Sequence, residues 1–306
     1  MKYLVTGGAG FIGSNIVKKL VARGDNVTVI DNLNTGKKEN LVSVIDKISF
    51  LKDSILNINL LEQETEGIDG IFHQAALASV QDSFSKPEEY NDVNVNGTEN
   101  ILKLAKKNNF KVVYASSSSV YGNPERIPIK ETDAKNPFNP YAETKLQDEE
   151  LAIKYANLGS QIIGLRYFNV FGKRQSKEYA GVIKLFLDQI KNKQSPIVNG
   201  DGAQFRDFVH VSDVVNANIL SMTSNVKHAF FNVGTNSSIT ILDLAKTIID
   251  ASGLALEPKF RSALEGDVDQ TLSDISSISR EIGWKPTIKL EDWLKTIITT
   301  EEIDEV

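Results

Sequence analysis

Two residues four positions apart carry the side chains needed for acid–base chemistry. Tyr141 and Lys145 lie in Asn139-Pro140-Tyr141-Ala142-Glu143-Thr144-Lys145, where Pro140 suits the first turn of a helix. The spacing places both side chains on one helix face. An ordinary tyrosine has a pKa of about 10 and needs about 4 kcal/mol of phenolate stabilisation to act as a base near pH 7. A lysine ammonium can supply part of it, although an ordinary helix often shows the same pair.

A run of hydroxyl residues gives the pair a setting. Ser116-Ser117-Ser118-Ser119 follows Lys111–Ala115, which has the composition of a buried strand. Ligands of open α/β folds bind at the carboxyl ends of such strands. A serine there can hydrogen-bond the oxygen on which a tyrosine acts, whereas the run alone would indicate only a turn.

A glycine-rich turn near the N-terminus points to a dinucleotide. Thr6-Gly7-Gly8-Ala9-Gly10-Phe11-Ile12-Gly13 stands between a strand-like run and an amphipathic one, where a pyrophosphate can meet the N-terminal amides of a helix. Asp31 ends the next strand and can accept hydrogen bonds from ribose hydroxyls, which favours NAD over NADP. Asp53 follows Ile48–Leu51 and could position the adenine. The alternatives are a structural turn with a capping Asp31 and a surface-loop Asp53.

The elements that must position these residues alternate between strand and helix. We expect an α/β fold, a doubly wound parallel sheet (Rossmann) with a smaller mixed α/β substrate domain. We place the NAD-binding domain at 1–166, with 207–235 rejoining it, and the substrate domain at 167–206 and 236–306. The expected strands are Lys2–Val5, Val27–Ile30, Ile48–Leu51, Ile71–His73, Lys111–Ala115, Gln161–Arg166 and Phe230–Val233, and the expected helices include Phe11–Val21, Val95–Lys107 and Tyr141–Leu158.

Composition excludes several classes of protein. The chain has 306 residues, no cysteine and three histidines, so disulfides, thiolate nucleophiles and multi-histidine metal sites are not expected. A net charge of −6 argues against general nucleic-acid binding. The apolar runs are too short for a membrane span, and Met1 leads directly into a strand, so we expect a cytoplasmic protein without a signal peptide.

Together these blocks resemble the extended short-chain dehydrogenase/reductase family, and within it the nucleotide-sugar 4-epimerases of the UDP-glucose and UDP-N-acetylglucosamine type. The resemblance covers nearly the whole chain. It rests on Thr6–Gly13, Asp31-Asn32-Leu33, His73-Gln74-Ala75-Ala76, Asn94-Val95-Asn96-Gly97-Thr98, Ser116–Gly122, Tyr141–Lys145, Arg166–Gly172, Gly200–His210 and Gly283-Trp284-Lys285-Pro286.

The resemblance implies roles for individual residues. The catalytic residues fall on Ser117, Tyr141 and Lys145, and no metal is implied. NAD binding falls on Gly7, Gly10, Phe11, Ile12, Gly13, Asp31, Asn32, Asp53, Ser54, Ala75, Asn94, Tyr141, Lys145 and Tyr167. Substrate binding falls on Ala78, Ser117, Ser118, Tyr141, Asn169, Val182, Arg206, Asp267 and Thr271.

Three positions narrow the reaction and the substrate. Related 4,6-dehydratases carry Asp-Glu where this chain has Ser118-Ser119, so elimination of water is unsupported. Glucose-restricted epimerases tend to carry a tyrosine at the position of Thr271. The small Thr271 and Ala78 therefore favour UDP-GlcNAc/UDP-GalNAc, with UDP-Glc/UDP-Gal as possible extra substrates.

The chain departs from the family pattern at one of the residues that bind the diphosphate of the sugar nucleotide. Family members bind this group with an asparagine and an arginine, which fall on Asn169 and Arg206 here, and with a second arginine. Leu264 stands at the second arginine's place. Either Arg261 substitutes or one arginine acts alone. For Arg206 itself the alternative is a salt bridge with Asp207.

By resemblance, Tyr141 takes the proton of the sugar 4-hydroxyl while C4 gives hydride to NAD⁺. The 4-keto sugar then rotates about its diphosphate linkage. NADH returns the hydride to the opposite face of the sugar, and Tyr141 returns the proton. Homodimerisation through the helices at Val95–Lys107 and Tyr141–Leu158 is expected. Rival interpretations are a uronic-acid epimerase, a decarboxylase, a reductase or a non-catalytic NAD-sensing module. We expect His73 and Trp284 to pack in the core, and His210 and Asp213 to begin a helix.

Overall fold

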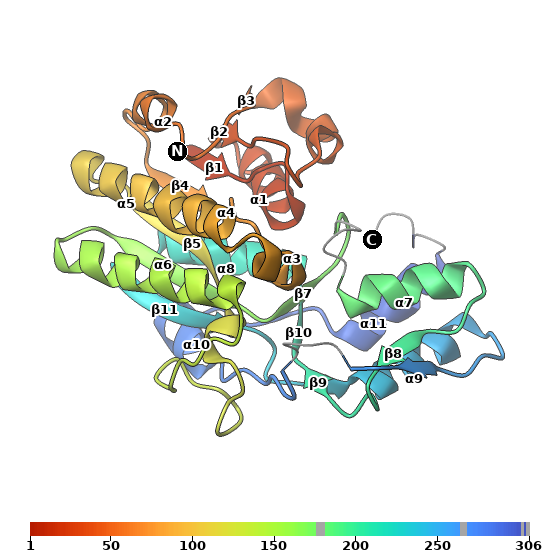
Figure 1. The fold of residues 1–306 in the computed structure, drawn as a ribbon. Helices are drawn as coiled ribbons and strands as arrows, with labels where there is room; N and C mark the ends of the chain where they lie inside the picture. The colour runs from red at the N-terminus through yellow and green to blue at the C-terminus, as the bar shows by residue number, and fades with distance from the viewer. Residues whose placement is uncertain (176–180, 264–267, 301–302, 304–306) are drawn as a thin grey trace.

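The computed structural model describes residues 1–175, 181–263, 268–300 and 303. Its centre is a sheet of seven parallel strands in the order β11-β6-β5-β4-β1-β2-β3 (Figure 1). This confirms the predicted doubly wound fold. The strands are β1 (Lys2–Thr6), β2 (Asn26–Ile30), β3 (Ser49–Leu51), β4 (Gly70–His73), β5 (Lys111–Ser117), β6 (Ile162–Tyr167) and β11 (His228–Val233).

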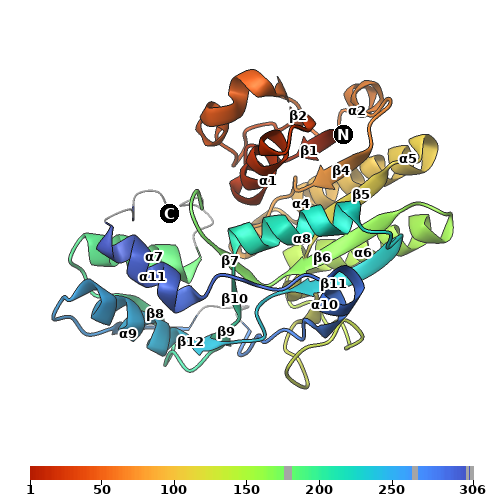
Figure 2. The ribbon, with the colours of Figure 1, turned by 180° about the vertical axis from the view of Figure 1, so that it is seen from behind.

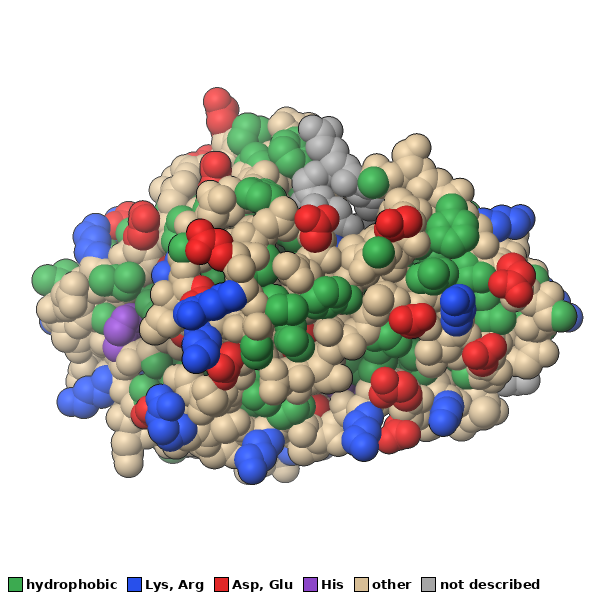
Figure 3. Space-filling view, turned by 90° about the horizontal axis from the view of Figure 1, so that it is seen from below, with side chains coloured by type: hydrophobic (Ala, Val, Ile, Leu, Met, Phe, Trp, Pro, Cys, Tyr) green, Lys and Arg blue, Asp and Glu red, His purple; other side chains and the backbone are tan. Residues whose placement is uncertain are grey.

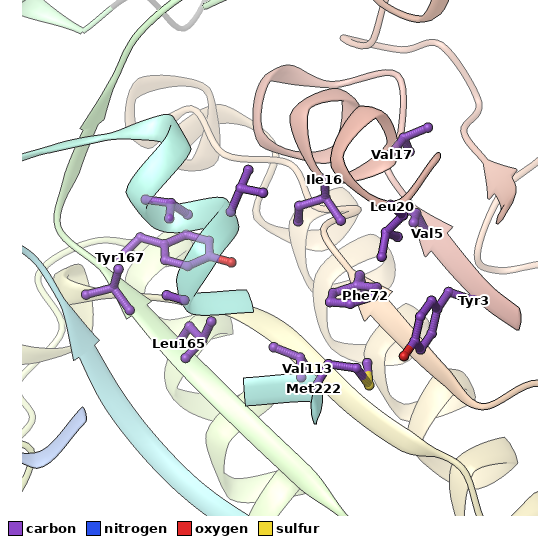
Figure 4. Packing of buried hydrophobic residues seen from close by; sticks show 14 of the residues in the cluster. Tyr3, Val5, Ile16, Val17, Leu20, Phe72, Val113, Leu165, Tyr167 and Met222 are labelled. Atoms are coloured by element: carbon purple, nitrogen blue, oxygen red, sulfur yellow. The ribbon is translucent and has the colours of Figure 1, made fainter. Parts of the chain in front are cut away.

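Helices cover both faces of the sheet, and the strands are apolar on both sides for that reason. Neighbouring residues of β1 show the alternation, because Leu4 packs toward α5 (Gly97–Asn108) and α6 (Pro140–Asn157) while Val5 packs toward α1 (Phe11–Ala22) and α8 (Val211–Thr223) (Figures 1 and 2). Figure 4 shows the hydrophobic core on the face of the sheet to which Val5 points. In this core Ile16 and Leu20 of α1 lie near Phe72 of β4.

The edge strand β11 comes from far along the chain. Phe231 of β11 pairs with Leu165 of β6, so the strand predicted at 230–233 does rejoin the first sheet. This return leads into a smaller lobe beside the sheet (Figure 1). The lobe contains α7 (Val182–Lys191), β8 (Ile197–Asn199), β9 (Phe205–Arg206), β12 (Ile239–Thr240), α9 (Ile241–Ser252), β13 (Lys259–Arg261) and α11 (Leu290–Thr299).

The smaller lobe has its own core, in which Phe186, Leu244 and Leu294 are buried. Its strand pairs mix directions, since β13 runs parallel to β8 and β12 antiparallel to β9. Between the lobes, β7 (Asn169–Phe171) pairs with β10 (Phe208–His210). The remaining elements are α2 (Ile58–Glu64), α3 (Val80–Ser85), α4 (Pro87–Tyr90), α10 (Ser276–Ile282), 3₁₀ turns at Lys38–Lys47 and Ser118–Tyr121, and a π-helical turn at Asn91–Asn96.

Trp284, His210 and Asp213 have structural roles. Trp284 is buried and its indole N–H donates to the Asp213 carbonyl at 2.9 Å. His210 caps α8 by accepting from Ser212 N at 3.2 Å, and the Asp213 carboxylate accepts from Thr287. The prediction that this segment begins a helix is confirmed.

The surface shows no gathering of one charge on the face drawn in Figure 3, where Lys and Arg side chains are interspersed with Asp and Glu. Within the described residues, none of the helices combines the length and the apolar character that crossing a bilayer requires.

Candidate active site

The glycine turn is packed so tightly that side chains are excluded. A Cβ on Gly13 would lie 2.1 Å from the Gly7 carbonyl oxygen, and a Cβ on Gly7, whose φ is +66°, would lie 2.6 Å from Ala75 N. Gly10 precedes α1 and offers no side-chain cap, which leaves the first amides of the helix open to an anion. The turn therefore has the form of a phosphate cradle.

Asp31 is fixed beside this turn. Its carboxylate is buried and accepts from Ala9 N at 2.9 Å and from Leu33 N at 2.8 Å. Burial raises the pKa of Asp31, while the two amide hydrogen bonds lower it. The same carboxylate thus braces the glycine turn and ends β2 at the point where a ribose is expected.

A cleft of about 350 Å³ opens over the turn. Among its lining residues are seven that the sequence predicts for NAD: Gly7, Gly10, Asp31, Asn32, Asp53, Ser54 and Ala75. No role was assigned from the sequence to Asn34, Thr35, Gln74, Glu89 and Val93, which also line it. An anion cradle at one side and buried or partly buried carboxylates at the other fit a dinucleotide whose ribose carries free hydroxyls.

The other residues predicted for NAD occupy supporting positions in the structure. The Asn94 amide accepts from Leu77 N at 2.8 Å and donates to the Leu77 carbonyl and to Thr144. The Tyr167 hydroxyl bonds with Asn218 at 2.8 Å, and burial raises its pKa. Phe11, Ile12 and Gly13 form the start of α1. The cofactor-binding roles of these five residues, like those of the seven that line the cleft, remain predictions.

The predicted tyrosine and lysine stand at the beginning of α6. Asn139 caps this helix by accepting from Ala142 N at 2.9 Å, and Pro140 occupies its first turn. Tyr141 is half-buried, whereas Lys145 is buried and its Nζ lies 3.1 Å from Asp148 Oδ2. The sequence predicted the pair but not the carboxylate that accompanies the lysine.

The serine run forms the carboxyl end of β5 and the turn after it, against which α6 packs. Ser117 Oγ accepts from Ser119 N at 3.1 Å, which orients the side chain toward its own turn. Ser118 begins the turn and is half-buried. Ser116 Oγ donates to Glu149 at 2.7 Å and serves the interior.

A buried ion pair that the sequence did not reveal holds α6 on the sheet. Glu149 accepts from Arg166 Nε at 2.7 Å and Nη2 at 2.8 Å, and both residues are 1% exposed. Arg166 also lies over the rings of Tyr121 and Phe230. The arginine inside the apolar run Ile162–Tyr167 is the sequence feature that could have indicated this ion pair. A charged residue in a central strand requires a partner of opposite charge.

A second cavity, of about 560 Å³, lies at the smaller lobe. Three residues predicted for substrate binding line it, namely Asn169, Val182 and Arg206. The segment 75–81 reaches both cavities, because Ala75 lines the first and Val80 and Gln81 line the second. Polar lining residues that the sequence did not single out are Gln81, Gln175, Gln189, Asn199 and Gln204.

Arg206 and Arg261 both line this second cavity. Arg206 Nη1 donates to the Phe205 carbonyl at 2.9 Å, and Nη2 donates to the Val268 carbonyl. The Asp207 carboxylate accepts from Thr235 and Ser273, so its oxygens are engaged by other segments. Arg261 Nε donates to Asn199 Oδ1.

The remaining predicted substrate residues are separated. Thr271 is buried beside Asn169, with 3.2 Å between its Oγ1 and Asn169 Nδ2, and Ala78 is exposed just before α3. Asp267 and Leu264 lie outside the described residues. Among the residues that the structure describes, there is no cluster of histidine and carboxylate groups suited to a metal ion.

His73 is a buried link rather than a surface acid or base. Its Nδ1 lies 2.7 Å from Thr6 Oγ1 and its Nε2 lies 3.0 Å from Thr98 Oγ1. Burial lowers its pKa to about 3, with a further contribution from the Lys145 charge. The prediction that it packs in the core is confirmed.

Comparison with known proteins identifies the family. The model of the NAD dependent epimerase/dehydratase family matches residues 3–234. The chain belongs to this family. A putative UDP-glucose 4-epimerase of Methanocaldococcus jannaschii is 39% identical over 300 residues, 96% of each chain. NAD is therefore the cofactor of this chain.

Two solved structures share the whole architecture. UDP-N-acetylglucosamine 4-epimerase from Methanobrevibacter ruminantium, in complex with UDP-N-acetylmuramic acid, superposes with a TM-score of 0.93, 37% identity and coverage of 99% of this chain and 98% of that one. UDP-glucose 4-epimerase from Thermotoga maritima, with UDP-glucose, gives 0.93, 34% and 99% of both chains. This family member is thus similar to epimerases that handle sugars of different size.

Proposed function

We propose that the chain interconverts the C4 epimers of a UDP-hexose, with UDP-GlcNAc/UDP-GalNAc as the preferred pair and UDP-Glc/UDP-Gal as possible extra substrates. The observation that carries this proposal is the segment 75–81, which lines both the NAD cleft and the 560 Å³ cavity. This supports binding of the sugar nucleotide on the side of the segment opposite to the cofactor. The similarity to UDP-sugar epimerases supports the substrate class.

In this proposal Tyr141 moves the proton. Its phenolate takes the proton from the sugar 4-hydroxyl and returns it after the sugar has turned. Lys145 stabilises the phenolate, and Ser117 hydrogen-bonds the same sugar oxygen as it gains carbonyl character. The chemistry supplied by bound NAD is reversible hydride uptake from C4 of the sugar. Because both transfers are reversed, no net oxidation occurs.

The diphosphate is the anchor about which the sugar turns. We assign it to Arg206 and Asn169, because a guanidinium pairs with phosphate oxygens in a fixed geometry. Thr271 and Ala78 are small, and this supports a C2 N-acetyl substituent. Ser118 and Ser119 lack the acid and base that loss of water would require. We place the sugar-nucleotide-binding part at 167–206 and 236–306, and propose a homodimer through α5 and α6.

The test is product analysis on the NAD-loaded enzyme with UDP-GlcNAc, UDP-glucose and UDP-glucuronate in parallel. We expect the 4-epimer of UDP-GlcNAc at the highest kcat/KM, without accumulation of NADH. Loss of carbon dioxide from UDP-glucuronate would instead assign a decarboxylase, and NAD binding without any product would leave a sensing module. The homodimer is checked by light scattering of the purified protein.

A further inference from the structure

Asp148 is a buried acidic residue to which the proposed mechanism assigns no role. Residues 141, 145 and 148 are spaced four and three apart, so Tyr141, Lys145 and Asp148 form one stripe along α6. Asp148 Oδ2 lies 3.1 Å from Lys145 Nζ, and the side chains are 0% and 4% exposed. The catalytic lysine is therefore one half of a solvent-free ion pair.

The surroundings show that this carboxylate belongs to Lys145. From α6 itself, Glu149 is also near, but its oxygens accept from Arg166 of β6. From β4, His73 faces the pair and is held between Thr6 and Thr98. From β5, Tyr114 is buried, and its pKa is raised by burial first and by the charges of Glu149 and Asp148 in addition.

The position of Asp148 along the stripe gives it an electrostatic effect on Tyr141. At 1.5 Å per residue, Lys145 lies about 6 Å and Asp148 about 10 Å along the helix from Tyr141. The ammonium is nearer and favours a phenolate, whereas the carboxylate opposes it at longer range. Asp148 and Lys145 are buried and Tyr141 is half-buried, so water screens the second charge only in part and we expect it to act on Tyr141.

We propose that Asp148 is a positioning residue that holds Lys145 in the interior and limits how strongly its charge stabilises the Tyr141 phenolate. The role of Tyr141 as the base rests on the function proposed above. Burial raises the pKa of Asp148 to about 6, while the Lys145 ammonium and the Thr98 hydroxyl lower it. Asp148 is therefore mostly charged at pH 7, where it opposes the Tyr141 phenolate. This effect is lost as the pH falls through about 6 and Asp148 takes up a proton.

The experiment measures the phenolate directly and needs no sugar. The near-ultraviolet absorbance of the NAD-loaded protein is titrated with base, and the component that Tyr141→Phe removes is assigned to Tyr141. The titration is repeated for Asp148→Asn, which keeps the shape of the side chain and removes its charge, with the double variant as its baseline. Glu99→Gln is the matched control, because Glu99 joins α5 to α6 through Lys154 but does not contact Lys145.

We expect the Tyr141 midpoint to fall by roughly one pH unit in Asp148→Asn and to stay in place in Glu99→Gln. An unchanged or higher midpoint in Asp148→Asn, or an equal fall in Glu99→Gln, contradicts the proposal. Asp148→Ser provides a second uncharged variant, and failure of both variants to fold assigns Asp148 to stability alone. Because the readout is independent of turnover, absence of epimerase activity would refute the proposed function without deciding the role of Asp148.

Discussion

The Asn169 side-chain amide donates a hydrogen bond to the Thr271 hydroxyl at 3.2 Å, which joins residues 102 positions apart in the sequence. The same hydroxyl accepts from Asp207 N at 3.3 Å, and Asn169 Nδ2 also donates to the Asp207 carbonyl at 3.1 Å. Thr271 thus ties the C-terminal part of the chain to the residues that line the larger cavity. In the function proposed above, a change at this position alters both these hydrogen bonds and the space left for the sugar.

Substitution of Thr271 by tyrosine separates these two effects. We expect Thr271→Tyr to reduce kcat/KM for UDP-GlcNAc more than for UDP-glucose, because a phenol ring takes the room of an N-acetyl group. Thr271→Val is the matched control, since it replaces the hydroxyl with a methyl group of similar size. The control should cost about 1–2 kcal/mol of unfolding free energy and leave the substrate ratio unchanged. Equal losses for both sugars in Thr271→Tyr would remove the argument for an N-acetylated substrate.

The two arginines of the larger cavity are tested by binding of UDP. We expect Arg206→Gln to weaken UDP binding at least about tenfold, because a charged hydrogen bond is worth about 1.5–3 kcal/mol. Arg261 lines the same cavity, so we expect Arg261→Gln to weaken binding as well. Lys259→Gln, on the same strand β13, is the control for loss of charge. If Arg261→Gln binds UDP as the wild type does, a single arginine holds the diphosphate.

Removal of the Tyr141 hydroxyl tests the base. We expect Tyr141→Phe to lower kcat by about 10²–10⁴, the range attributed to a positioned proton-transfer group. NAD binding, followed by fluorescence, should stay within about twofold of wild type, since phenylalanine keeps the aromatic ring and Tyr141 is not among the residues that line the cleft. A variant that turns over at a near-normal rate would refute the assignment.

Much of the fold could be predicted, because its evidence lies in local patterns. The apolar strands separated by helices gave the parallel sheet, and Gly7 and Gly13 gave the turn, since no other residue fits there. The boundaries were less accurate. The helix expected to begin at Val95 begins at Gly97, after a π-helical turn in which Asn94 bonds to Leu77.

The parts of the site that depend on distant contacts could not be predicted in this way. Asp148 and Glu149 look like ordinary polar positions of an amphipathic helix, yet both are buried against partners. The polar side chains of the larger cavity, such as Gln189 and Gln204, come from separate elements of the smaller lobe. Their common location is decided by packing of the lobe, for which no short motif exists.

We expect the buried ion pair between Glu149 and Arg166 to stabilise the folded chain. Glu149→Gln leaves the Arg166 guanidinium buried without its counter-charge, and we expect a loss of about 3–5 kcal/mol of unfolding free energy. Urea denaturation followed by circular dichroism measures the loss. Glu150→Gln, at the exposed neighbouring position, is the control and should stay within about 0.5 kcal/mol of wild type. Comparable values for the two variants would show that the buried pair is not a major anchor of α6.

His73 makes the fold sensitive to acid. Its pKa is lowered to about 3 by burial, so the folded chain resists a proton that the unfolded chain binds at about pH 6.5. The unfolded state therefore binds more protons below pH 6.5, and stability falls as the pH drops toward 3. Between pH 7 and pH 4.5 this amounts to about 3 kcal/mol. We expect His73→Asn to flatten the pH dependence of unfolding free energy by about that amount, whatever its effect at pH 7. His228→Asn, at an exposed position of β11, should keep the wild-type slope. An unchanged slope in His73→Asn would mean that other buried groups set the acid response.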